Sequence, residues 1–173
     1  MIKSVLTVLL LAATSRADTF LLTVGAYQRG SGPSGAHTFM RMERVVPDGT
    51  SDTLCISWMP AGDKVRLLRG SEAGENWTWE RTLDHAKERR CRISLWGPYP
   101  VGVELWNRAC IRTHELASGR VQYQALDGQG QRPRAVNCIH AVSGITGAPL
   151  WTGFAYGEQA SVLVFYHLMR VSR

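Results

Sequence analysis

The residues from His37 to Val46 alternate between two faces, and this pattern predicts a β-strand. Met40 and Met42 share one face, whereas the other face carries His37, Phe39, Arg41, Glu43 and Val45. A period of two residues is typical of a half-buried strand. Residues 19–27, rich in aliphatic and β-branched side chains, predict a strand before it, and residues 53–59 predict another after the turn at residues 47–49. These segments favour an antiparallel sheet.

The second half of the chain mixes helical and extended patterns. Asn76 is placed to cap a helix that ends near Arg90. The spacing of apolar residues predicts further helices over residues 103–117, from residue 137 onward, and over residues 158–169. Short strands are expected at residues 91–96 and 121–126, with a break at residues 97–100. The sum is an α+β fold, in which helices pack on an antiparallel sheet.

The N-terminus has the pattern of a removable secretory leader. Lys3 precedes an apolar run from Val5 to Ala13, and small residues lead to a cleavage site after Ala17. This run is too short to cross a bilayer, which takes roughly 20 apolar residues, and no later stretch is long and apolar enough. We therefore expect residues 1–17 to be a signal peptide and residues 18–173 to form a single domain that is periplasmic or secreted.

The charge of the chain bears on which partners it can bind, and its cysteine content bears on which disulfides it can form. Without Lys3 and Arg16, 18 basic and 14 acidic residues remain, and they are scattered. Nucleic-acid binding requires a basic patch interleaved with aromatic residues, so no nucleic-acid partner is expected. The even number of cysteines in an exported chain suggests two disulfides. If only one forms, we expect Cys91–Cys110; Cys55 has the pattern of a buried strand residue, and Cys138 either pairs with Cys55 or Cys110 or is a reactive thiol.

The segment Asn137-Cys138-Ile139-His140 is the strongest candidate for chemistry. It opens a predicted helix, where backbone N–H groups and the helix dipole lower the pKa of a thiol and can hold an oxyanion. A thiol nucleophile needs a histidine nearby in space as its general base. His140 is only two residues away and points elsewhere on a helix. His37, at the start of a strand, is therefore the preferred base.

Gly35-Ala36-His37-Thr38-Phe39, followed about 100 residues later by Asn137-Cys138-Ile139-His140, resembles the circularly permuted papain-like proteins. These include the permuted NlpC-type hydrolases and the lecithin:retinol acyltransferase group, in which the histidine strand precedes the cysteine helix. The resemblance implies a permuted papain-like arrangement, with Cys138 as nucleophile and His37 as base. It also implies a third polar residue on the next strand, which is Ser57 here, with Thr53 as the lesser choice.

Two functions follow from these observations. The first is an exported thiol-dependent amidase or peptidase, esterase or acyltransferase that acts through a Cys138 thioester and needs no metal or organic cofactor. Its substrate would be an envelope compound: a peptidoglycan peptide, a lipid ester or a protein amide. The alternative is a non-catalytic, disulfide-stabilised extracytoplasmic binding or structural module. The six tryptophans, Trp151 among them, are expected mainly in the core rather than along a ligand groove.

Overall fold

The computed structural model describes residues 17–62, 64–67, 70–126 and 135–172. The predicted signal peptide lies outside these residues except for Ala17. A four-stranded antiparallel sheet, in the order β3-β2-β1-β6, forms the centre of the domain. Its strands are β1 (Thr19–Gln28), β2 (Ala36–Val45), β3 (Ser51–Ile56) and β6 (Arg92–Val101). The predicted α+β class with an antiparallel sheet is thus confirmed.

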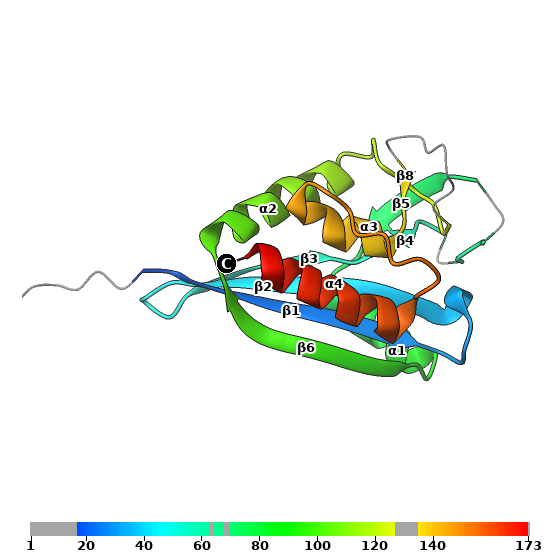
Figure 1. The fold of residues 1–173 in the computed structure, drawn as a ribbon, viewed down its shortest axis with the longest axis horizontal. Helices are drawn as coiled ribbons and strands as arrows, with labels where there is room; N and C mark the ends of the chain where they lie inside the picture. The colour runs from blue at the N-terminus through cyan, green and yellow to red at the C-terminus, as the bar shows by residue number, and fades with distance from the viewer. Residues whose placement is uncertain (1–16, 63, 68–69, 127–134, 173) are drawn as a thin grey trace, which may run out of the picture.

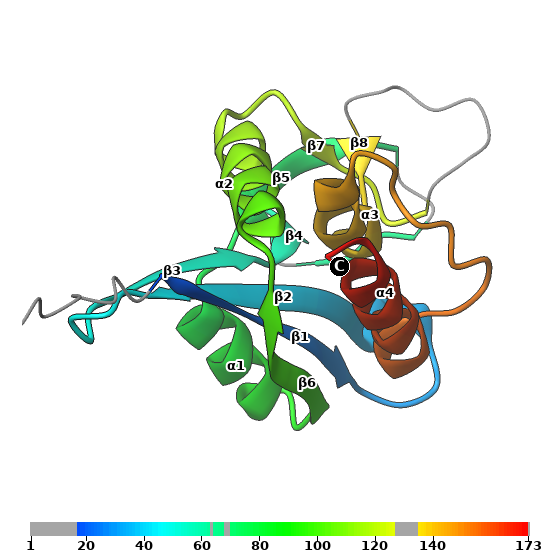
Figure 2. The ribbon, with the colours of Figure 1, turned by 60° about the vertical axis from the view of Figure 1, so that its left-hand side comes forward.

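Helices cover both faces of this sheet (Figures 1 and 2). Helix α1 (Trp79–Glu88) packs on one face, and the other face carries α2 (Val103–Ala117), α3 (Cys138–Ser143) and α4 (Gly157–Val171). Two short 3-10 turns, η1 (Pro33–Gly35) and η2 (Gly144–Thr146), complete the helical elements. The alternation along β2 sets this division: Phe39 packs against Trp79 of α1, and Met40 joins the larger core on the opposite face.

A second, smaller sheet lies beyond the end of β3. It consists of β4 (Trp58–Pro60), β5 (Glu72–Asn76), β7 (Gln122–Tyr123) and β8 (Ala135–Val136). The single strand expected at residues 53–59 is therefore wrong, because the chain passes from one sheet to the other at Ser57. Gly74 of β5 leaves room for the Trp58 ring of the neighbouring strand β4, since a Cβ there would lie 2.0 Å from that ring.

Two further local expectations are corrected. The break at residues 97–100 is absent: β6 continues through it, with Gly97 at φ 129° where the register against β1 shifts between Leu22 and Val24. Helix α1 is capped by Thr78, whose side chain accepts from the Arg81 N–H, rather than by Asn76. Asn76 instead ends β5, accepts from the Ser57 N–H and donates to the Cys55 carbonyl.

Candidate functional site

His37 lies under α1, where it is buried among aromatic rings. It is the second residue of β2, it is only 2 % exposed, and its ring stacks on Phe39 at 5.8 Å between ring centroids. The Tyr27 ring lies 5.0 Å away on the neighbouring strand, directly opposite in the register. The strand alternation that the sequence displays thus fixes the direction in which the imidazole points.

Ser57 is the hydrogen-bond partner of this imidazole. His37 Nε2 lies 2.9 Å from Ser57 Oγ. Thr82 Oγ1 of α1 lies within donating distance of two acceptors, Ser57 Oγ at 2.7 Å and the Thr78 carbonyl at 2.8 Å, and its single proton can go to only one of them. Hydrogen bonds therefore connect His37 through two hydroxyl groups to the backbone of α1. The expected pairing of His37 with Ser57 is present, whereas Thr53 is exposed on β3.

Burial decides the protonation state of His37. Loss of hydration, with a smaller contribution from the nearby His85, lowers the pKa of His37 to about 3. Burial penalises the charged form of a histidine, so the ring stays neutral across the physiological range. A general base works best when its pKa lies near the operating pH. His37 therefore has the properties of a structural histidine in this environment.

Cys138 lies on the opposite side of the sheet. It is the first residue of α3, it is 9 % exposed, and it belongs to the core cluster that includes Met40 and Met42. Thr38, next to His37, also points to this side and bonds Ser161 of α4 at 2.8 Å. Successive side chains of a strand point to opposite faces. The structure thus brings His37 to Ser57 and does not bring it to Cys138.

The surroundings of Cys138 are set by an N-cap and by α2. Asn137 Oδ1 accepts from the His140 N–H at 2.8 Å, as expected for the residue that caps a helix. Arg112 of α2 donates to the carbonyls of His140 and Ala141 and so ties α3 to α2. Because the cap occupies the His140 N–H, that amide is not available for the expected oxyanion hole. The helix is only six residues long, which limits its dipole.

The disulfides expected from the sequence are not present among the described residues. Cys91 packs beside the Tyr27 and Phe39 cluster under α1, whereas Cys110 is exposed on α2, which covers the other face of the sheet. The preferred Cys91–Cys110 pairing is therefore wrong. Cys55, which the sequence predicted to be buried, is only partly buried on β3. Burial raises the pKa of its thiol to about 12, so the thiol stays protonated near neutral pH.

Cys138 lines an apolar cleft of about 500 Å³. The cleft lies between the start of α3 and the loop that leads into α4. Its described lining contains no Lys, Arg, Asp or Glu, and it includes Tyr123, Leu126, Ile139, Trp151, Phe154 and Tyr156. Trp151 is 61 % exposed and Phe154 fully exposed, so the expectation that the tryptophans lie mainly in the core fails at Trp151. The signal in the sequence was the run of aromatic residues between Gly147 and Gly157, a segment rich in turn residues.

The described part of the chain shows neither a metal-binding cluster nor a membrane-spanning helix. There, no group of three His, Cys, Asp or Glu side chains is arranged to hold a metal ion. Likewise, none of the helices in the described ranges has the length and apolar character needed to cross a membrane.

Comparison with protein-family models, curated proteins and solved structures finds no match to this chain. The resemblance to the permuted papain-like proteins therefore stays a prediction.

Proposed function

We propose that this protein binds a small molecule with a large apolar part in the cleft beside Cys138. The apolar lining of this cleft is the observation that carries the proposal. Clefts of about 300–1,000 Å³ lined by aromatic and aliphatic side chains are typical small-molecule sites. Exposed Trp151 and Phe154 at its edge would otherwise remain in water, and binding removes that apolar surface from solvent. The predicted leader supports a location outside the cytoplasm, where the ligand would be an envelope compound.

Truncation of the two exposed aromatic residues is expected to weaken binding of an uncharged naphthylamine dye. Aromatic side chains that anchor a ligand typically contribute enough that the Trp151→Ala/Phe154→Ala double variant loses about tenfold or more in affinity. Both side chains are exposed, so the fold should be unaffected. A matched control is Tyr166→Ala on α4, which removes an exposed aromatic residue that does not line the cleft. Equal affinity in the double variant and the wild type would contradict the proposal.

A second candidate is acyl hydrolysis or transfer at Cys138, as the permuted papain-like resemblance implies. It is favoured by one observation, namely that the Cys138 side chain lines the proposed binding cleft. The Cys138 thiolate would attack the carbonyl of a bound ester or amide, expel the alcohol or amine, and form a thioester for water or a second acceptor to cleave. In the arrangement described above, this chemistry would proceed without His37 as the base.

Alkylation kinetics test this second candidate. If the cleft presents acyl groups to Cys138, an iodoacetamide that carries a long alkyl chain labels Cys138 faster than iodoacetamide itself, whereas exposed Cys110 shows no such preference. We expect His37→Gln to leave the Cys138 rate unchanged within about twofold, because the imidazole lies across the sheet. Peptide mass mapping measures both rates in one sample. A large fall in the alkylation rate of Cys138 in His37→Gln would instead support His37 as the base that acts on Cys138.

A further inference from the structure

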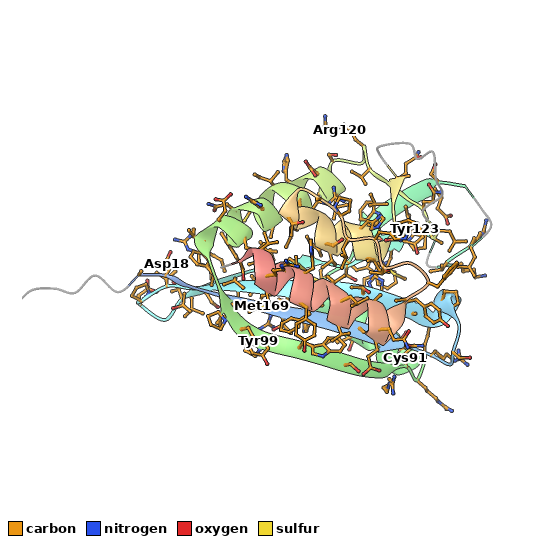
Figure 3. All side chains as sticks on the ribbon, in the orientation of Figure 1. Asp18, Cys91, Tyr99, Arg120, Tyr123 and Met169 are labelled. Atoms are coloured by element: carbon orange, nitrogen blue, oxygen red, sulfur yellow. The ribbon has the colours of Figure 1, made fainter. Side chains whose placement is uncertain are left out.

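Residues 147–157, which join η2 to α4, form one wall of the apolar cleft, and residues 151–157 all line it. Tyr123 of β7, labelled in Figure 3, lines the cleft from another element, near the end of the domain at which α4 begins. In the segment before α4, Phe154 is fully exposed and Trp151 is 61 % exposed. Both side chains would gain free energy from a movement that buries them, because apolar surface would leave water.

The centre of this segment is a turn that is hydrogen-bonded within itself. Thr152 Oγ1 donates to the Ala155 carbonyl at 3.2 Å, and the Ala155 N–H donates to the Thr152 carbonyl at 3.1 Å. Within the ranges that the structure describes, residues 151–155 form no hydrogen bond to the rest of the domain. Segments with few bonds to the remainder of a protein move at low cost in free energy. The turn is therefore the part of the cleft wall that moves most readily.

The chain is fixed to the domain on either side of this turn. Before it, the Leu150 N–H donates to Ser143 Oγ of α3 at 2.9 Å, and after it, Tyr156 Oη donates to the Ser31 carbonyl. Within the turn, Gly153 adopts φ 61°, a left-handed conformation that glycine adopts without strain, and a Cβ there would contact nothing. The turn thus lies between two anchored points, with open space around its glycine.

From this arrangement we infer that residues 151–155 form a lid, which closes over the ligand of the apolar cleft and buries Phe154 against it. The inference rests on the proposed function and adds how the site encloses its ligand. Trp151 already contacts His140 of the cleft wall, with 6.2 Å between the ring centroids, so Phe154 is the side chain that moves. The ligand favours the closed state because it contacts the Phe154 ring only there.

Fluorine NMR of protein labelled uniformly with 4-fluorophenylalanine tests the inference. The chain contains four phenylalanines, so the spectrum should show four resonances, and Phe154→Leu identifies the resonance of the lid. The chemical shift of an exposed fluorine differs between water and heavy water, whereas that of a buried fluorine does not. We expect Phe154 to show this solvent shift in the free protein and to lose most of it when the uncharged naphthylamine dye saturates the cleft.

The other three phenylalanines are matched controls in the same spectrum. Phe39 and Phe165 are buried and do not line the cleft, so their resonances should show little solvent shift with or without the dye. Phe20 is half-buried against Trp106, with 5.7 Å between the ring centroids, and its solvent shift should be the same in both states.

The two proposals fail in different ways. If Phe154 keeps its full solvent shift in the saturated complex, the lid is excluded. In that case, weaker dye binding by the Trp151→Ala/Phe154→Ala variant would leave the proposed function standing. If the double variant binds the dye as tightly as the wild type does, the proposed function fails and the lid fails with it.

Discussion

We expect acidification to destabilise this protein through His37, by about 1.4 kcal/mol for each pH unit between about pH 6.5 and about pH 3, because burial lowers the pKa of His37 in the folded protein to about 3. In the unfolded chain, His37 takes up a proton with a pKa of about 6.5. In the folded protein, burial holds this pKa far lower, so across this range the unfolded state binds more protons. The stability from a neutral His37 is complete above about pH 6.5 and is lost progressively as the pH falls.

Urea unfolding followed by tryptophan fluorescence measures this dependence. In His37→Gln, the slope of unfolding free energy against pH should fall by about 1 kcal/mol per unit between about pH 6.5 and pH 5, because an amide does not titrate. The variant itself will be less stable at neutral pH, but only the slope is compared. A suitable control is His114→Gln, which replaces an exposed histidine on α2 and should keep the wild-type slope. If wild type and His37→Gln lose stability in parallel, the buried neutral imidazole is excluded.

Replacement of Asn76 by alanine is expected to lower the free energy of unfolding by about 2 to 4 kcal/mol. Asn76 Oδ1 accepts from the Ser57 N–H at 2.8 Å, and Asn76 Nδ2 donates to the Cys55 carbonyl at 2.9 Å. These two backbone groups lie where the chain leaves β3 and enters β4. In the alanine variant, the Ser57 N–H and the Cys55 carbonyl both lose their hydrogen-bond partner. A buried polar group without a partner lowers the free energy of unfolding by more than a single hydrogen bond raises it.

Thermal and urea unfolding of Asn76→Ala give the size of this effect. The matched control is Asn107→Ala on α2, where the asparagine is exposed and alanine is the better helix former, so stability should be unchanged or slightly higher. We also expect Asn76→Ala to perturb Ser57 and, through it, the contact with His37. A loss below about 1 kcal/mol would show that water replaces the amide at this crossing.

The local patterns of the sequence were sufficient for most regular elements. The alternation in β2, the apolar spacing in α2 and the helix start at Asn137 all reflect interactions between residues a few positions apart. The elements that the sequence did not reveal, such as β5 and the course of β6 through residues 97–100, depend on pairing with distant strands. Periodicity carries no information about such partners.

In the candidate site, too, local sequence patterns predicted some features, whereas contacts between distant segments decided the others. The alternation of β2 predicted that His37 shares a face with Phe39, but not which layer of helices would cover that face. Packing of α1 there and of α3 on the other side separates His37 from Cys138. Ser57, the third polar residue that the family resemblance implied, does lie within hydrogen-bond distance of His37. The apolar cleft, by contrast, is formed by segments that lie far apart in the chain, from Pro33 to Gly157.

The sequence by itself determined the α+β class, the antiparallel strands of the N-terminal half and the approximate positions of the main helices. The reason is that helices and strands have fixed residue periods, so the spacing of apolar residues along the chain specifies which side chains share a buried face. Only the tertiary structure decided which face of the sheet each helix covers, which cysteines lie near one another, and where the apolar cleft opens. Those features depend on how whole layers pack, and the burial that packing imposes also makes His37 a neutral core residue.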